Sequence, residues 1–314
     1  MKIGFLFSGQ GSQSVGMGKD LYENFTEIKK LYECTEKITG IDIAKISFDG
    51  PDVELNKTQN TQLAILIECL GISQILKKNG IIPDAMAGLS LGEYTALINS
   101  EALNFEDGIK LVKKRGEYMQ KLVPEGEWLM AAVLGMEEEK VIEVCKLANE
   151  KSAENFVVPV NFNCPGQIVI SGNKAGVETA EVIAKEQGAR KVRELKTSGP
   201  FHTEKLKEAS ETLKKDLEKV EFHQFNNTVI KNIDGTKYKE TDDIRDILAK
   251  HIISPVKFTA VLQKMLDMGA DTFIEVGPGK TLSGFIKKMP TEKEIKILNI
   301  NNCETLENVL KEVK

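Results

Sequence analysis

The segment Gly88-Leu89-Ser90-Leu91-Gly92 matches the pattern G-x-S-x-G, in which a serine occupies a tight turn between a strand and a helix. Residues 83–89 are typical of a buried strand and residues 91–99 of a helix, so the serine falls at their junction. The flanking glycines relieve crowding in such a turn, and the hydroxyl then projects above the N-terminus of the next helix. The segment therefore predicts an α/β fold with Ser90 as a nucleophile. The alternative is a glycine-lined turn in which Ser90 only caps the helix.

Strand-like and helix-like segments alternate on both sides of this turn, which predicts a parallel sheet covered by helices. The predicted strands are residues 2–7, 83–89 and 272–276. The predicted helices are residues 62–78, 91–99, 106–122, 202–220, 244–252, 256–268 and 304–313.

The middle of the chain has a different order of elements, β-α-β-β-α-β, which is the ferredoxin-like unit. Its predicted elements are residues 128–134, 137–150, 156–161, 167–171, 173–187 and 189–195. We therefore expect an inserted α+β subdomain over residues 125–198. The larger domain, which would carry the catalytic residues, then comprises residues 1–124 and 199–314.

Composition excludes several classes of protein. The chain has 314 residues, 41% hydrophobic and 28% charged, which is ordinary for a globular protein of about two domains. No apolar run approaches the roughly 18 residues of a transmembrane helix, and the apolar opening is too short for a signal-peptide core. A net charge of −5 gives no overall field that would attract nucleic acid.

Five cysteines are scattered along the chain without a C-x-x-C pair. An odd number without paired spacing argues against a disulfide framework or a zinc site, and we expect a reducing, cytoplasmic setting with no bound metal. Two phosphate-binding patterns also fail. The GKT letters at 279–281 lack the first P-loop glycine, because Ile274 stands there, and Ser14 replaces the third dinucleotide-binding glycine.

A serine at its ordinary pKa needs a neighbouring base, and the chain has three histidines. His202 follows Ser198-Gly199-Pro200-Phe201 at the start of a predicted helix, where the helix dipole disfavours protonation. We expect it to be the base, the alternative being a structural histidine in a turn. His223 lies in a polar stretch and is expected at the surface. His251 ends a predicted helix, where capping is the simplest interpretation.

Arg115 is the one charge inside the apolar arc of the predicted helix 106–122, between Leu111 and Met119. A guanidinium keeps its proton, so an inward one needs an anion. That anion is either an internal Asp or Glu or a ligand. Because the helix follows the Ser90 turn, Arg115 is a candidate clamp for a substrate carboxylate, which its planar fork would bind through two hydrogen bonds.

These residues together resemble the malonyl-CoA:acyl carrier protein transacylase family over nearly the whole chain. Seven segments match in order: 7–13, 60–62, 88–94, 115–116, 161–167, 200–202 and 275–280. The resemblance implies an α/β-hydrolase-like larger domain with a ferredoxin-like insertion, in agreement with the order of elements.

The resemblance also implies roles for individual residues. Ser90 would be acylated, His202 would be its base, and the backbone N–H groups of Gln10 and Leu91 would form the oxyanion hole. Arg115 would hold the malonyl carboxylate. The remaining substrate-binding residues would be Gln62, Asn161 and Phe201, and Phe201 matches the malonyl-selecting form of its motif rather than the methylmalonyl-selecting serine.

Two positions depart from the family pattern. Leu89 stands where a histidine often precedes the nucleophile, so a polar contribution from that side chain is absent. His251 stands where the family usually has a glutamine whose backbone carbonyl orients the catalytic imidazole. A carbonyl survives substitution, so the dyad is still expected, and a role for the His251 ring is open.

The implied reaction transfers a malonyl group from malonyl-CoA to the phosphopantetheine thiol of an acyl carrier protein, with no bound cofactor. The free-standing size of the chain favours fatty acid synthesis, and we expect a monomer. An acidic carrier would need a basic patch, for which the candidates are Arg190, Lys191 and Arg193, or Lys287 and Lys288. The rival functions are a serine hydrolase, which shares the turn, and a non-catalytic assembly module.

Overall fold

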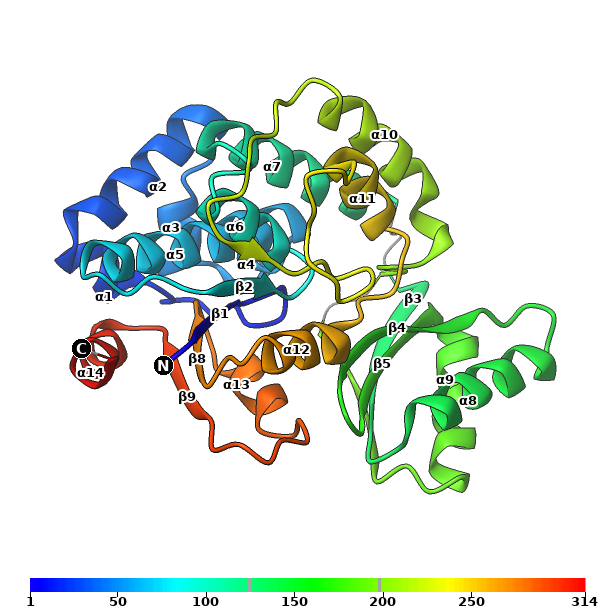
Figure 1. Cartoon of the computed structure of the whole chain (residues 1–314). Coiled ribbons are helices and arrows are strands. Elements are labelled where there is room, and N and C mark those ends of the chain that lie inside the picture. The colour runs from blue at the N-terminus through cyan, green and yellow to red at the C-terminus, as the bar shows by residue number, and fades with distance from the viewer. Residues whose placement is uncertain (123–125, 197–198, 314) are drawn as a thin grey trace.

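Two β-sheets organise the computed structural model, which describes residues 1–122, 126–196 and 199–313 (Figure 1). The larger sheet has the strand order β7-β2-β1-β8-β9, and every neighbouring pair in it is parallel. Its strands are β1 (Ile3–Phe7), β2 (Ala85–Gly88), β7 (Thr228–Val229), β8 (Thr272–Val276) and β9 (Lys296–Ile300).

Helices cover both faces of this sheet because alternate residues of its strands point to opposite sides. Phe5 and Phe7 pack into the cluster formed with α5, α6 and α7, whereas Leu6 packs into the cluster formed with α12 and α13. On the first side lie α1 (Lys19–Asn24), α2 (Thr26–Thr39), α3 (Ile43–Asp49), α4 (Asp52–Leu55), α5 (Thr58–Lys78), α6 (Gly92–Asn99), α7 (Phe105–Lys121), the 3₁₀ turn η1 (Glu204–Leu206), α10 (Lys207–Leu217) and α11 (Ile244–His251). On the other side lie α12 (Phe258–Asp267) and α13 (Thr281–Ile286). Helix α14 (Cys303–Val313) lies beside β9 and packs into the first cluster, in contact with α1.

The smaller sheet is antiparallel, with the order β4-β5-β3-β6. Its elements are β3 (Trp128–Leu134), α8 (Glu138–Lys151), β4 (Val157–Cys164), β5 (Gln167–Asn173), α9 (Lys174–Glu186) and β6 (Lys191–Glu194). Helices α8 and α9 cover one face, where Val133 and Ile170 are fully buried. Strand β5, the third of this unit, lies between β3, the first, and β4, the second. The predicted ferredoxin-like unit is therefore confirmed.

The two sheets meet where β4 runs beside the segment that leads into α12. The N–H of Phe162 donates to the carbonyl of Val256 at 2.9 Å, and the N–H of Val256 donates to the carbonyl of Val160 at 2.8 Å. The face of the smaller sheet opposite α8 and α9 carries Met130 and Ala132. This face is turned toward the Ser90 end of the larger sheet.

The predicted α/β fold with an inserted α+β unit is confirmed, but several elements differ. The predicted helix over 202–220 is wrong at its start, because His202 has a left-handed φ of 61° and α10 begins only at Lys207. Helices α1 to α4 and α13 and strands β7 and β9 were not predicted. The domain boundaries stay a prediction, and residues 123–125 and 197–198, at both predicted crossings, lie outside the described residues.

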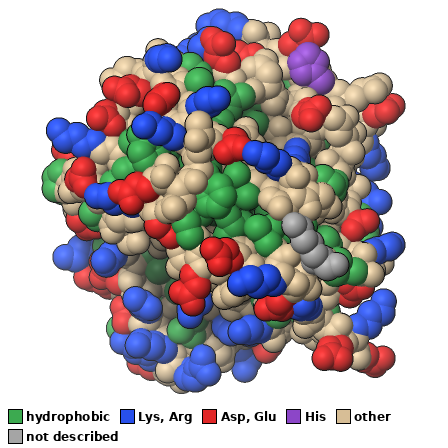
Figure 2. Space-filling model, turned by 90° about the vertical axis from the view of Figure 1, so that its left-hand side faces the viewer, with side chains coloured by type: hydrophobic (Ala, Val, Ile, Leu, Met, Phe, Trp, Pro, Cys, Tyr) green, Lys and Arg blue, Asp and Glu red, His purple; other side chains and the backbone are tan. Residues whose placement is uncertain are grey.

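Acidic and basic side chains are interspersed on the face shown in Figure 2, with small apolar areas between them. In the described part of the chain, no helix has both the length and the apolar character that crossing a membrane requires.

Candidate active site

Ser90 lies in the tight turn between β2 and α6, with a left-handed φ of 53°. Its flanking glycines are required by close approach of the backbone. A Cβ at Gly88 would lie 2.2 Å from the carbonyl carbon of Gly92, and a Cβ at Gly92 would lie 2.5 Å from the carbonyl oxygen of Phe7. The structure therefore has the strand–turn–helix geometry that the sequence pattern predicts.

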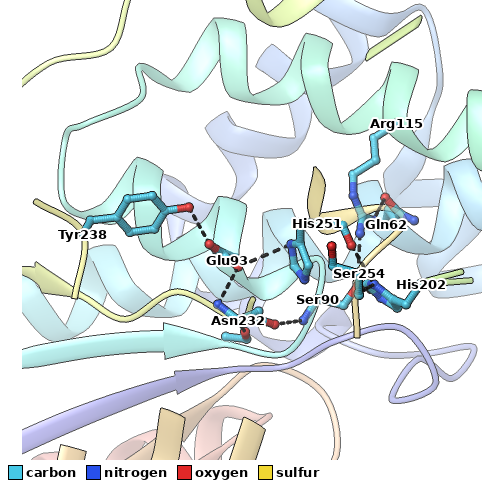
Figure 3. A network of polar contacts seen from close by, with 10 residues as sticks. Gln62, Ser90, Glu93, Arg115, His202, Asn232, Tyr238, His251 and Ser254 are labelled. Carbon is cyan, nitrogen blue, oxygen red and sulfur yellow. Dashed lines mark hydrogen bonds and ion pairs between the residues drawn. The ribbon is translucent and has the colours of Figure 1, made fainter. Parts of the chain in front are cut away.

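The side chain of Asn232 holds this turn together from a distant loop. The N–H of Ser90 donates to its Oδ1 at 2.7 Å, and its Nδ2 donates to the carbonyl of Gly88 at 2.7 Å (Figure 3). Asn232 is fully buried, so these hydrogen bonds satisfy backbone groups that water does not reach. They fix the conformation in which the Ser90 hydroxyl faces the site.

His202 is hydrogen-bonded to that hydroxyl, with 2.8 Å between its Nε2 and the Oγ of Ser90. Its Nδ1 lies 2.9 Å from the carbonyl oxygen of His251 and 3.1 Å from that of Ser254. Carbonyl oxygens only accept hydrogen bonds, so Nδ1 carries the proton and Nε2 offers its lone pair to Ser90. This is the tautomer that a general base for a serine requires.

Burial, helped by the positive charge of Arg115, lowers the pKa of His202 to about 4, against the opposing effect of the two backbone hydrogen bonds. The imidazole is therefore neutral at pH 7. The expected cause, the dipole of a helix beginning at His202, is wrong, because only the three-residue turn η1 follows before α10.

Arg115 points into the same site from α7 and is 1% exposed. Its Nη1 donates to Oε1 of Gln62 at 2.7 Å, and its Nη2 donates to the Oγ of Ser90 at 3.0 Å. The guanidinium also lies over the ring of Tyr94, 5.6 Å from its centroid. Of the two anions that the sequence left open, the internal one is not found: within the described residues, Arg115 forms no ion pair, and its Nε has no hydrogen-bond partner.

A cavity of about 450 Å³ opens in front of the dyad. It brings together Ser90 and His202 with three more of the predicted site residues, Gln10, Asn161 and Phe201. The larger sheet and its loops supply the wall with Ser90, and the smaller sheet supplies the opposite wall with Met130, Ala132 and Val169. The cavity is therefore formed by both units of the fold.

The two backbone N–H groups expected to form the oxyanion hole remain free to donate. Neither the N–H of Gln10 nor that of Leu91 makes a hydrogen bond to a described residue. Leu91 begins the turn into α6 beside Ser90, and Gln10 follows the close approach of Gly9 to Leu89. Their role stays a prediction.

The remaining histidines differ from expectation in one case. His223 is exposed, as predicted. The side chain of His251 does not cap its helix, because neither ring nitrogen has a hydrogen-bond partner among the described residues. The residue is 1% exposed, and its Nδ1 lies 3.3 Å from an oxygen of Glu93. Its carbonyl accepts the hydrogen bond from His202, as the resemblance implies.

Sequence reasoning missed three residues of this network. Glu93 carried a usable signal, because it is the one acid on the apolar helix α6, just as Arg115 is the one charge inside the apolar arc of α7. Asn232 and Ser254 carried no such signal, since both lie in loops far along the chain from Ser90 and His202.

Comparison with known sequences gives close relatives over the whole chain. The family described as "Acyl transferase domain" matches residues 4–311. The malonyl CoA-acyl carrier protein transacylase of Bacillus subtilis (strain 168) is 42% identical over 313 residues, which is 100% of this chain and 98% of the relative. A protein of the same name from Staphylococcus aureus (strain MSSA476) is 37% identical, covering 98% and 97%.

Solved structures agree with this result. The malonyl CoA-acyl carrier protein transacylase of Clostridium perfringens Atcc 13124 has a TM-score of 0.93 at 44% identity, covering 100% of this chain and 97% of that one. A transacylase described as a complex with a type II PKS acyl-carrier protein has a TM-score of 0.94 at 33% identity, covering 99% and 100%. The chain therefore belongs to the acyl transferase family, together with the malonyl CoA-acyl carrier protein transacylases.

Proposed function

We propose that the chain transfers the malonyl group of malonyl-CoA to the phosphopantetheine thiol of an acyl carrier protein through a malonyl-serine intermediate. One observation in the structure of this chain supports the proposal independently of its similarity to named relatives. A buried guanidinium without a carboxylate partner in the described residues lies 3.0 Å from the hydroxyl of a serine–histidine dyad. A nucleophile beside a buried cation that no carboxylate contacts suits an acyl group that itself bears an anion.

The first half of the reaction acylates Ser90. Its Oγ attacks the thioester carbonyl while Nε2 of His202 takes the hydroxyl proton, and a tetrahedral oxyanion forms. The free N–H groups of Gln10 and Leu91 would stabilise that oxyanion, and one such donor typically contributes about 3 kcal/mol. The C–S bond then breaks, and His202 returns the proton to the thiol of coenzyme A.

The second half repeats the chemistry in reverse with another thiol. The phosphopantetheine thiol gives its proton to His202 and attacks the malonyl-serine carbonyl, and collapse of the intermediate returns the proton to Ser90. Water must lose this competition for the acyl-enzyme. We therefore expect the malonyl-enzyme to hydrolyse slowly when no carrier is present.

Arg115 would bind the malonyl carboxylate through its two Nη groups. Gln62, which accepts from Nη1 at 2.7 Å, would hold the guanidinium in plane for this bidentate contact. Phe201 and Asn161, which line the cavity, would bound the space for the rest of the acyl group and the thioester arm.

The proposed partner is an acidic acyl carrier protein, and one residue of each predicted basic patch supports this role. Arg193 lines the cavity, and Lys288 donates to Gln167, another lining residue, at 2.9 Å. One structural relative is itself described in complex with an acyl-carrier protein. Either patch would bring the phosphopantetheine arm toward Ser90.

The proposed setting is fatty acid synthesis in the cytoplasm, with the chain acting as a monomer. The scattered free cysteines support a reducing compartment. The proposed chemistry uses no resident cofactor or metal, because malonyl-CoA is the substrate and the partner carries the phosphopantetheine.

Intact-protein mass spectrometry after brief mixing with malonyl-CoA tests the proposal, with acetyl-CoA in parallel and Ser90→Ala as the control. We expect a malonyl adduct that maps to Ser90, is absent from the control and with acetyl-CoA, and is discharged by a carrier-protein thiol. Release of coenzyme A without an adduct would instead identify a thioester hydrolase. No adduct and no release would favour a non-catalytic assembly module.

A further inference from the structure

A buried carboxylate lies behind the Ser90–His202 dyad. Glu93, in the first turn of α6, is 1% exposed. The hydroxyl of Tyr238 donates to its Oε1 at 2.5 Å, and the N–H of Asn232 donates to its Oε2 at 3.1 Å. The same Oε2 lies 3.3 Å from Nδ1 of His251. Donors on both oxygens favour the ionised form of this carboxyl group.

His251 connects Glu93 to the dyad. Its ring lies between Glu93 on one side and His202 on the other (Figure 3). The centroids of the two histidine rings are 5.1 Å apart, and the carbonyl of His251 accepts from Nδ1 of His202 at 2.9 Å. One residue thus contacts the carboxylate through its side chain and the base through both its ring and its backbone.

This arrangement addresses an electrostatic problem of the dyad. In a serine–histidine–acid triad, a carboxylate on the Nδ1–H side stabilises the imidazolium that forms during acylation. Here two neutral carbonyls occupy that side of His202, and Arg115 adds a positive charge to the site. A buried negative charge one residue further away would offset the cost of the imidazolium.

We propose that ionised Glu93 acts on the dyad through the His251 ring, stabilising the positive charge that His202 gains as Ser90 is acylated. Glu93 is thus a positioning residue, which exchanges no proton with substrate. The proton of Ser90 moves only to Nε2 of His202. The proposal rests on the acylation of Ser90 described under the proposed function.

The surroundings of Glu93 predict how this effect depends on pH. Burial raises its pKa to about 7, against the hydrogen bonds from Tyr238 and Asn232. The charged and titratable groups that face Glu93 and His251 are Arg115, which favours the ionised carboxylate, Asp234, which opposes it, and Tyr94, Tyr238 and His202. Since His202 is neutral above about pH 4, an increase in acylation rate near pH 7 would report Glu93.

The first experiment measures the single-turnover rate of Ser90 acylation by malonyl-CoA between about pH 5.5 and pH 9. We expect the rate of the unmodified protein to rise about tenfold through neutrality, the effect of one nearby buried charge. In Glu93→Gln the rate should stay at the lower level throughout. A merely structural role for Glu93 would lower the rate by the same factor at every pH.

Three further variants sharpen this test. Tyr238→Phe removes a donor to the carboxylate without touching His202, and should move the step to higher pH. His251→Gln keeps the backbone carbonyl but removes the ring, and should make the step smaller. His223→Gln, at an exposed histidine, is the matched control and should leave the profile unchanged.

A second measurement does not depend on the substrate. The chain has three histidines, so the imidazole NMR signals of ¹⁵N-labelled protein can be assigned with the His223 and His251 variants. We expect the His202 signals to shift near pH 7 in the unmodified protein and not in Glu93→Gln. This shift without malonyl transfer would contradict the proposed function but support the coupling. A His202 titration that is the same in both proteins would overturn the coupling.

Discussion

Arg115 is the residue that we propose as the determinant of acyl-group selectivity. It is fully buried, yet it bonds only neutral groups, Gln62 and Ser90, among the described residues. Burying a guanidinium without a carboxylate in contact with it is costly, so a bound malonyl carboxylate would relieve a cost that is already present in the free protein. Selectivity for malonyl would then come from the neutralisation of the buried guanidinium by the substrate carboxylate as well as from the fit of the acyl group.

Replacement of this arginine should therefore affect malonyl more than acetyl transfer. We expect Arg115→Ala to lower kcat/KM for malonyl-CoA by about a hundredfold or more, since an interaction with a buried charged group is lost. Acetyl transfer should fall much less, through loss of the contact to Ser90 alone. Lys110→Ala, an exposed cation on the same helix, is the control. Equal losses for both acyl groups would exclude the clamp.

At this scale the sequence predicts the reacting groups but not what holds them. Ser90, His202 and Arg115 each stand out by motif or by an anomalous charge. The structure places both His202 and Arg115 within hydrogen-bond distance of the Ser90 hydroxyl. Asn232 contacts the Ser90 turn from 142 residues along the chain. Its role depends on tertiary structure, so no local periodicity reveals it.

At the scale of single elements, helix α5 is buried on almost every side, as expected of a helix at the centre of a domain. It nevertheless carries Glu68, which is 2% exposed. Neither carboxyl oxygen of Glu68 has a hydrogen-bond partner among the described residues. Burial, together with the negative charge of Asp20, raises the pKa of Glu68 to about 8.

The contribution of Glu68 to the stability of the protein should therefore decrease with rising pH. The folded state binds the proton of Glu68 more tightly than the unfolded chain, whose carboxyl has a pKa near 4.5. The contribution is complete below pH 4.5 and is lost by about pH 8. The advantage of Glu68→Gln in the free energy of unfolding should grow from near zero at about pH 4 to about 4 kcal/mol at pH 9.

Urea unfolding at a series of pH values measures this difference, with Glu33→Gln on the exposed side of α2 as the control. The control should follow the unmodified protein at each pH. If Glu68→Gln also runs parallel to it, Glu68 does not hold a proton in the folded state.

Sequence patterns predict the long elements better than the short ones. Helices α1, α3 and α4 have six, seven and four residues, which is too short for a clear helical period. Strand β7 has two residues, and β9 is mostly half-buried at the sheet edge, so neither shows a buried strand pattern. Helix α2 is different, since its buried Ile28, Leu31 and Tyr32 have the spacing of one helix face, which is a signal present in the sequence.

For the whole molecule, the distribution of charge matters more than its sum. The net charge is −5, yet Lys191 and Arg193 on β6 and Lys287 and Lys288 after α13 are exposed. Arg193 lines the cavity, and Lys288 contacts Gln167, which also lines it. An acidic carrier would be attracted to such a local field even when the protein as a whole is negative.

Charge reversal should separate the two substrates. We expect Lys191→Glu with Arg193→Glu, or Lys287→Glu with Lys288→Glu, to raise KM for the carrier protein about tenfold and to weaken its dependence on salt. KM for malonyl-CoA should not change. Lys311→Glu on α14, away from the cavity, is the control. If a pair raises KM for both substrates together, that pair is not the carrier surface.

The cavity has one wall from each sheet, and this division has a consequence for how substrate preference can change in evolution. The dyad and Arg115 belong to the larger unit, whereas Met130, Ala132 and Val169 project from the smaller sheet across the gap. Substitutions on the smaller sheet can widen or narrow the space for an acyl chain while the reacting atoms keep their geometry. Drift in substrate preference and preservation of the chemistry can therefore proceed on separate parts of one chain.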